Sequence, residues 1–156
     1  SDIHCRLIHI ALSECHDDIF KHYTALSYVW GDASQTKAVF INSLPFEITS
    51  NLFDALHEIR PEEQSLRLWA DAICIDQLNF KERSSQVGLM REIYSYAAFT
   101  VIYLGRSNIE CDWAFAAVRD SCYQLNRRFL DVISTQILSR PWFSRVWTFQ
   151  ELVLSR

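Results

Sequence analysis

Three short apolar segments, separated by helical patterns, constrain the fold of this chain more than any other feature of its sequence. Residues 23–30 (YTALSYVW), 66–75 (LRLWADAICI) and 100–104 (TVIYL) are rich in aliphatic and aromatic residues, and each is followed by Gly or Asp. Runs of this length and composition indicate buried strands. Because these segments alternate with helical patterns, we expect βαβ crossovers and a mainly parallel sheet.

Helical periodicity fills the stretches between these strands. Apolar residues recur at i, i+3, i+4 and i+7 in residues 50–59, with Thr49 or Ser50 as the N-cap and Pro61 beyond the end. We predict further helices at 81–98, 112–125 and 141–154, a short strand at 5–12, and a hairpin formed by 37–41 and 46–48. The predicted fold class is α/β, with residues 66–75 at the centre of a mainly parallel sheet and helices on both faces, in a flavodoxin-like three-layer arrangement.

Composition and charge exclude several classes of protein. The net charge is −4 with both signs interspersed, so the chain lacks the basic stripe that nucleic acid requires. Five cysteines without a CxxC pair, and histidines without paired spacing, indicate neither a disulfide framework nor a metal site. No apolar run approaches the ~20 residues of a membrane helix. We expect a cytoplasmic protein without a resident cofactor.

We expect residues 1–156 to form a single domain. A chain of this length normally has one core, and it has almost no Gly or Pro for a linker. The sequence begins without Met and ends inside an apparent helix, so we expect it to be a piece of a longer polypeptide.

Polar residues follow each of the three predicted strands. They are Trp30-Gly31-Asp32, Asp76-Gln77 and Gly105-Arg106. Sites in parallel α/β proteins gather at the carboxyl ends of strands, and Gly31 permits close approach of a nucleotide. A plain turn needs the same residues as a nucleotide loop, and Asp76 suits a site or a turn cap equally well.

Asp71 is a charged residue in a segment predicted to be a buried strand. An unpaired charge there would cost several kcal/mol, so Asp71 requires a partner. Arg145 or Arg140 is available from the last part of the chain. We favour a structural ion pair of Asp71 with Arg145 that holds the last helix against the sheet.

Three blocks of the sequence resemble one known family. They are residues 23–31 (YTALSYVWG), residues 140–151 (RPWFSRVWTFQE), and residues 68–77 (LWADAICIDQ) with Asn79, Glu82, Arg83, Gln86, Met90, Ile93 and Tyr94. In this order they are similar to the HET (heterokaryon-incompatibility) domain of filamentous fungi. The resemblance implies a role in self/non-self recognition and programmed cell death. It also implies other domains of the parent protein and incompatibility proteins as partners, and self-association on activation.

A second resemblance, to the TIR domain of innate-immune receptors, bears on mechanism. Ser27-Tyr28 with Asp32 is similar to the first TIR strand and loop, and Asp76-Gln77 resembles the entry to the loop over the TIR site. Ser144, Trp147 and Glu151 are similar to a pattern on a TIR helix whose glutamate cleaves NAD in many members. The resemblance implies Glu151 as the catalytic residue and a set of nucleotide-binding residues: Tyr28, Trp30, Gly31, Asp32, Asp76, Gln77 and Trp147.

The chemistry of NAD cleavage suits one well-placed carboxylate. Loss of nicotinamide passes through an oxocarbenium-like transition state, which a nearby negative charge stabilises. Trp147 lies four residues before Glu151 and therefore shares its helix face. The alternative is that Trp147 belongs to the core and Glu151 pairs with an arginine.

Three functions therefore remain open. The first is a non-catalytic, oligomerising signalling module, and the second is an NAD glycohydrolase with NAD as its substrate. The third is a nucleotide-binding regulatory domain, for which the sequence has no phosphate-binding motif. The enzyme requires Glu151 to be exposed beside the strand ends, whereas the signalling module permits it to be buried.

Overall fold

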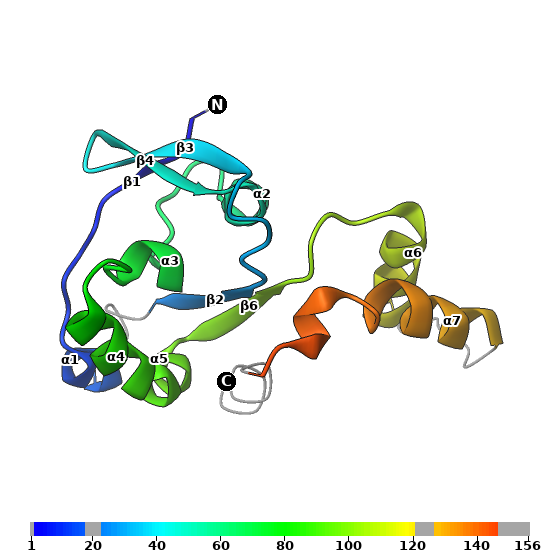
Figure 1. Cartoon of the computed structure of the whole chain (residues 1–156). Helices are drawn as coiled ribbons and strands as arrows, with labels where there is room; N and C mark the ends of the chain where they lie inside the picture. The colour runs from blue at the N-terminus through cyan, green and yellow to red at the C-terminus, as the bar shows by residue number, and fades with distance from the viewer. Residues whose placement is uncertain (1, 18–22, 121–126, 147–156) are drawn as a thin grey trace.

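A three-stranded parallel sheet lies at the centre of the molecule (Figure 1). The computed structural model describes residues 2–17, 23–120 and 127–146. The strand order is β5 (Leu68–Trp69), β2 (Thr24–Tyr28) and β6 (Phe99–Tyr103), and β2 pairs in parallel with both neighbours. The predicted α/β fold with a mainly parallel sheet is confirmed.

A second, mixed sheet contains the predicted hairpin. It consists of β1 (His4–Cys5), β3 (Thr36–Ile41) and β4 (Leu44–Thr49), with β1 parallel and β4 antiparallel to β3. The hairpin turns at Asn42 and Ser43, whose φ angles are 50° and 69°. Two positive φ angles in a two-residue turn match the right-handed twist of the strands. Most of the strand predicted at 5–12 is not formed. β1 ends at Cys5, and the next regular element is α1 (Leu12–Asp17).

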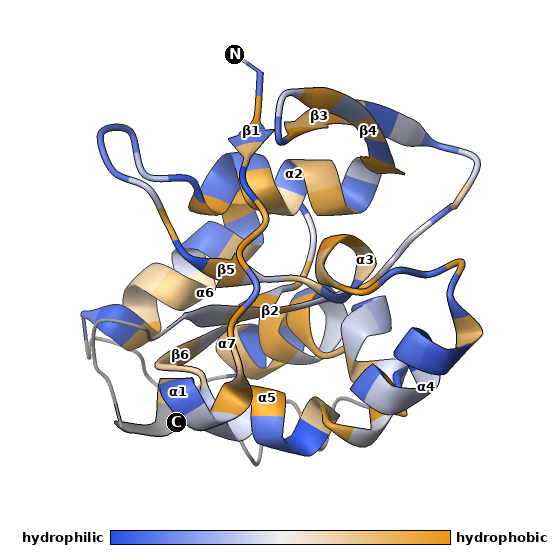
Figure 2. Cartoon of the chain, turned by 90° about the vertical axis from the view of Figure 1, so that its left-hand side faces the viewer, coloured by the Kyte–Doolittle hydropathy of each residue, from blue (hydrophilic) through white to orange (hydrophobic). Residues whose placement is uncertain are grey.

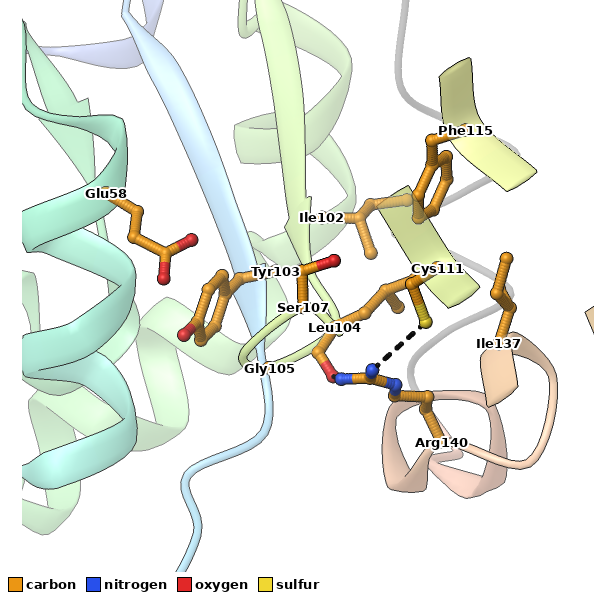
Figure 3. A pocket seen from close by; sticks show the side chains of 10 residues that line it. All are labelled: Glu58, Ile102, Tyr103, Leu104, Gly105, Ser107, Cys111, Phe115, Ile137 and Arg140. Carbon is orange, nitrogen blue, oxygen red and sulfur yellow. Dashed lines mark hydrogen bonds between the residues drawn. The ribbon is translucent and has the colours of Figure 1, made fainter. Parts of the chain in front are cut away.

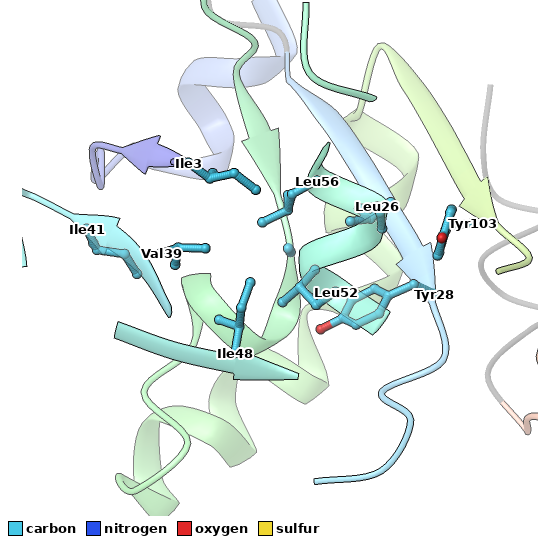
Figure 4. Packing of buried hydrophobic residues seen from close by; sticks show 11 residues of the cluster. Ile3, Leu26, Tyr28, Val39, Ile41, Ile48, Leu52, Leu56 and Tyr103 are labelled. Atoms are coloured by element: carbon cyan, nitrogen blue, oxygen red, sulfur yellow. The ribbon is translucent and has the colours of Figure 1, made fainter. Parts of the chain in front are cut away.

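Helices cover both faces of the parallel sheet. α2 (Ser50–Ile59) lies between the two sheets, capped by the Thr49 hydroxyl, which accepts a hydrogen bond from the Leu52 N–H. Figure 4 shows the apolar cluster that α2 shares with both sheets. Successive residues of β2 point to opposite faces, so Leu26 joins this cluster while Ala25 packs with Ile93 of α5 (Met90–Tyr96).

Two predictions in the middle of the chain were wrong. Residues 66–75 do not form the central strand, because β5 is an edge strand of two residues and α3 (Asp71–Cys74) follows it directly. The single helix predicted at 81–98 is divided at Leu89 into α4 (Phe80–Gly88) and α5. α4 has no buried residue and is largely hydrophilic (Figure 2), so it contributes little to the core.

The last described part of the chain forms a helical arm beside the sheets (Figure 1). The arm contains α6 (Ile109–Arg119), α7 (Arg127–Val132) and a π-helical turn, η2 (Ile133–Ile137). It has its own apolar cluster, formed by Cys111, Ala114, Ala117, Phe129, Val132 and Ile137. Of the helix predicted at 141–154, the described residues contain a short 3-10 helix, η3 (Pro141–Ser144), followed by extended backbone at Arg145. Among the described helices, none has the length and apolar character to cross a bilayer.

Candidate functional site

The three sequence blocks meet at the carboxyl half of β2. Trp142, from the last block, is 1% exposed and donates a hydrogen bond from its indole N–H to the Ser27 hydroxyl oxygen at 2.6 Å. Ser27 is equally buried and lies one residue before the end of β2. A bulky aromatic side chain with its polar atom satisfied makes a strong buried anchor. Trp142 thus fixes the end of the helical arm to the central strand.

Asp71 joins the first block to the second. Its carboxylate accepts hydrogen bonds from the Tyr28 hydroxyl and the Trp30 indole N–H, both at 2.8 Å. The N–H of Ala72 donates to the same carboxylate at 2.8 Å. Burial and the neighbouring Asp71 charge raise the pKa of Tyr28 well above its usual range, so the hydroxyl remains a donor. Asp71 has the partner that we predicted it must have, although of a different kind.

The expected ion pair of Asp71 with Arg145 is absent from the described ion pairs. The prediction placed Asp71 inside a strand, but Asp71 begins α3, where the first-turn N–H groups favour a carboxylate. Two aromatic donors, Tyr28 and Trp30, come from the end of β2, the strand that pairs with β5 just before Asp71. Neutral donors therefore satisfy Asp71 where we expected a cation.

Gly31 and Asp32 form a tight turn after β2. Gly31 has a φ of 77°, and a Cβ added there would lie 3.3 Å from the Cβ of Asn51. The Asp32 carboxylate accepts hydrogen bonds from the N–H and the hydroxyl of Ser34, which hold its pKa below the usual range. These contacts stabilise the turn itself. Of the two interpretations of this loop, the described contacts match the plain turn, and nucleotide binding by Trp30, Gly31 and Asp32 remains a prediction.

Asp76 and Gln77 also use their side chains locally. The Asp76 carboxylate accepts a hydrogen bond from the Leu78 N–H at 3.0 Å, as a turn cap does. The Gln77 amide donates to the backbone oxygen of Asp71 at 2.9 Å and so brings the end of the second block close to Trp30. Trp147 and Glu151 lie outside the described residues. Their predicted roles, and the nucleotide-binding roles of Tyr28, Asp76 and Gln77, remain predictions.

A cavity of about 260 Å³ opens at the carboxyl end of β6 (Figure 3). Tyr103 and Gly105 line it from the strand end, Glu58 from α2, and Phe115 and Ile137 from the arm. Sequence reasoning noted Gly105-Arg106 as a strand end but did not identify Glu58 or Tyr103 as site residues. Glu58 has no motif around it, and its position on α2 becomes relevant only when α2 packs beside β6.

Arg140 closes one side of this cavity. Its guanidinium donates to the backbone oxygens of Leu104 at 3.2 Å and Arg106 at 2.8 Å, and to the Cys111 sulfur at 3.3 Å. Its Nε donates to the backbone oxygen of Gln136 at 2.9 Å. Arg140 therefore connects the end of β6 to the arm through four hydrogen bonds.

Two polar groups of the cavity have no such partners. Tyr103 is 6% exposed, and its hydroxyl has no hydrogen-bond partner in the described part of the chain. Burial raises the pKa of Tyr103, and the nearby charges of Glu58 and Asp54 raise it further. Glu58 belongs to none of the ion pairs in the described residues, whereas Asp54 pairs with Lys37 at 2.8 Å and Arg106 at 2.9 Å. Among the described residues, no group of three His, Cys, Asp or Glu side chains has the arrangement of a metal site.

Comparison with known proteins identifies the class to which this chain belongs. Residues 23–151 match the family described as heterokaryon incompatibility protein (HET). The chain is similar to heterokaryon incompatibility protein 6, OR allele, of Neurospora crassa, with 31% identity over 166 aligned positions. The match covers 90% of this chain and 24% of that protein, so the chain spans about a quarter of the length of this relative. No solved structure matches. The chain belongs to the HET family, as its three blocks predicted.

Proposed function

We propose that this HET domain is an oligomerising signalling module whose engagement in fungal self/non-self recognition triggers programmed cell death. Its family membership and its incompatibility relative support the biological role. The observation that supports self-association is the surface of α6. Ile109 is 86% exposed on this helix, and Trp113, Phe115 and Val118 are exposed too.

α6 is more apolar than its position at the surface requires. Cys111, Ala114 and Ala117 already supply the buried stripe that packs against α7 and η2. By the period of 3.6 residues per turn, Ile109 and Trp113 lie to one side of that stripe and Phe115 to the other. A helix that is apolar around most of its circumference is normally buried, and a large exposed apolar surface marks an interaction site. Contact between copies of the domain would cover it.

Two charge substitutions on α6 test this proposal. Ile109→Asp and Val118→Lys place an acid in the first turn and a base near the end of the helix, where both favour the helix dipole and preserve the fold. We expect each to lower self-association at least tenfold in sedimentation experiments on the purified chain and to reduce cell death in a fungal assay. Leu44→Asp on the hairpin is the matched control, because Leu44 is 70% exposed and lies on β4. Equal association of all variants and the wild type would contradict the proposal.

The parent protein supplies the expected partners. Because the chain corresponds to about a quarter of its Neurospora relative, we propose that other domains of its own polypeptide and incompatibility proteins trigger it in the cytoplasm. Fusing the domain to an inducible dimerisation module separates triggering from signalling. Cell death on induced dimerisation, without the remaining domains, is the expected result.

NAD cleavage is a second candidate, favoured by the cavity at the carboxyl end of β6. Sites in parallel α/β proteins lie at this edge of the sheet. In this alternative, Glu151 supplies the carboxylate that stabilises the oxocarbenium-like transition state.

The test follows nicotinamide release from NAD by the purified, concentrated chain. Glu151→Ala should abolish release, whereas Glu110→Ala, which removes an exposed carboxylate from α6, should not change it. Absence of release by the wild type, with Glu151→Ala still lethal in cells, would leave the non-catalytic module as the function.

A further inference from the structure

We propose that the cavity between α2, β6 and the helical arm binds a small ligand that has a cationic, hydrogen-donating head on a flat apolar body. Such a ligand would bind the cavity of a signalling module or of an enzyme alike. Its chemistry follows from which polar groups of the cavity wall already have hydrogen-bond partners and which do not.

The polar groups on the arm side of the cavity already make hydrogen bonds within the chain. Arg140 donates to three backbone oxygens and to the Cys111 sulfur. The Ser107 hydroxyl donates to the carboxylate of Asp112. These groups therefore shape the wall, and their hydrogen-bond donors are largely occupied.

The polar groups on the α2 side are free. The Tyr103 hydroxyl is buried without a partner in the described part of the chain, which is a costly arrangement unless a ligand or water completes it. Glu58 lines the same cavity, and Figure 3 shows its side chain extending from α2 toward Tyr103. Asp54, the other nearby acid, is neutralised by Lys37 and Arg106. The exposed Glu58 carboxylate is therefore the unpaired charged acceptor on this side of the cavity, and Tyr103 lines the cavity beside it.

Apolar side chains form the opposite wall. Phe115 and Ile137 of the arm line the cavity together with Ile102 and Leu104 of the β6 segment. Small-molecule sites combine such walls with a few convergent polar groups. The volume of about 260 Å³ equals roughly nine water molecules at about 30 Å³ each, which suits one ring with a short polar substituent.

Benzamidine is the probe for this chemistry, because its amidinium group presents paired donors on a flat ring. Benzoate has the same ring with the opposite charge, and benzyl alcohol has a neutral head. We expect the purified chain to bind benzamidine with a millimolar or lower Kd by isothermal titration, benzyl alcohol at least tenfold more weakly, and benzoate not measurably. Backbone amides of α6 should exchange more slowly with benzamidine present, because the ligand contacts both α2 and the arm.

Matched variants locate the binding. Glu58→Gln should weaken benzamidine binding at least tenfold, the loss typical of a hydrogen bond to a charged group, and Tyr103→Phe roughly threefold. Glu47→Gln on β4 removes the same charge from a side chain that, like Glu58, is exposed but does not line the cavity, and it should change nothing. Absence of benzamidine binding, binding of benzoate as strong as that of benzamidine, or equal weakening by Glu47→Gln and Glu58→Gln would each overturn the proposal. Thermal unfolding of each variant verifies that it folds.

Discussion

The ends of β2 and β6 lie at the same edge of the sheet and are chemically opposite. At the end of β2, Tyr28 and Trp30 both donate to the Asp71 carboxylate, which also accepts from the Ala72 N–H of α3. At the end of β6, the Tyr103 hydroxyl and the Glu58 carboxylate have no such partners in the described residues. The end of β2 holds the sequence blocks together, whereas the end of β6 leaves polar groups available to another molecule.

This contrast shows that a position at a carboxyl strand end is not sufficient to identify a site. Four of the residues singled out from the sequence lie at the end of β2, where hydrogen bonds within the chain occupy them: Tyr28, Trp30, Asp32 and Asp71. The cavity lies one strand away and is lined by residues without a motif. Five sets of substitutions test the distinction, in order of decreasing effect on stability.

The largest effect is expected from the anchor that holds the arm to β2. Trp142→Ala should lower the free energy of unfolding by ~3–5 kcal/mol, because it removes a fully buried aromatic side chain and leaves the Ser27 hydroxyl without its donor. Urea denaturation measures the change. Trp113→Ala is the control, since Trp113 is 39% exposed and should cost less than half as much. Similar losses in the free energy of unfolding for both variants would show that Trp142 contributes no more to stability than a partly exposed tryptophan.

The β2 end should respond strongly to loss of its shared acceptor. Asp71→Ala leaves the Tyr28 hydroxyl and the Trp30 indole without a partner, and we expect a loss of ~3 kcal/mol. Much of that loss should disappear in a Tyr28→Phe background, where the buried hydroxyl is absent. A double-mutant cycle by chemical denaturation measures this coupling. Strict additivity would show that Asp71 does not act through Tyr28.

Two glycines offer a comparison of opposite sign. Gly105 has a φ of 99°, and a Cβ there would lie 3.3 Å from a guanidinium nitrogen of Arg140. Gly105→Ala should therefore destabilise the chain by ~1–3 kcal/mol. Gly88→Ala in α4 meets nothing within 4 Å and should stabilise it by ~0.5–1 kcal/mol. Thermal unfolding of the two variants measures both changes. A similar effect of alanine at both positions would show that the backbone at Gly105 does not specifically require glycine.

The Asp54 ion pairs predict a modest dependence of stability on pH. Hydrogen bonds from Arg106 and Lys37 lower the folded-state pKa of Asp54 below its value in the unfolded chain. The stabilisation is complete above the unfolded pKa of about 4 and is lost as the pH falls through the lower folded value. Since Arg106 and Lys37 are well exposed, we expect at most about 1 kcal/mol. Asp54→Asn should remove this part of the acid dependence in denaturation curves between pH 6 and 3.

The smallest effects are expected at the open groups of the cavity. Glu58→Gln and Tyr103→Phe remove groups that lack partners among the described residues, so each should change the free energy of unfolding by less than about 0.5 kcal/mol or raise it slightly. A loss above 2 kcal/mol for either would show that the group supports the fold. The contrast between the two strand ends would then disappear.

The sequence predicted the regular elements well where local signals agreed. β2, β6, the hairpin and α2 follow from apolar runs, turn residues and the Thr49 cap, and each is present. The prediction failed at 66–75 because an apolar run cannot distinguish a strand from the short strand and helix turn seen here. Asp71 was the residue in that run that could have indicated the start of a helix, since a carboxylate suits the first turn of a helix better than the middle of a strand.

The candidate site was less predictable than the fold. The charge of Asp71 within an apolar run indicated correctly that Asp71 needed a partner, but the donors are aromatic residues from another block. Glu58 and Tyr103 come from α2 and β6, and only tertiary packing brings their polar groups to one cavity. Neither has a neighbouring motif that a single sequence would reveal.

The hydrogen bond between Ser27 and Trp142 joins residues 115 positions apart. A growing polypeptide emerges from the ribosome N-terminus first, so β2 must wait for nearly the whole domain to be synthesised before its buried hydroxyl gains this donor. Contacts at such long range form late because closing the chain costs entropy before any contact repays it. Completion of the domain is thereby tied to completion of its translation, and a chain interrupted before residue 142 would lack the contact that fastens the arm.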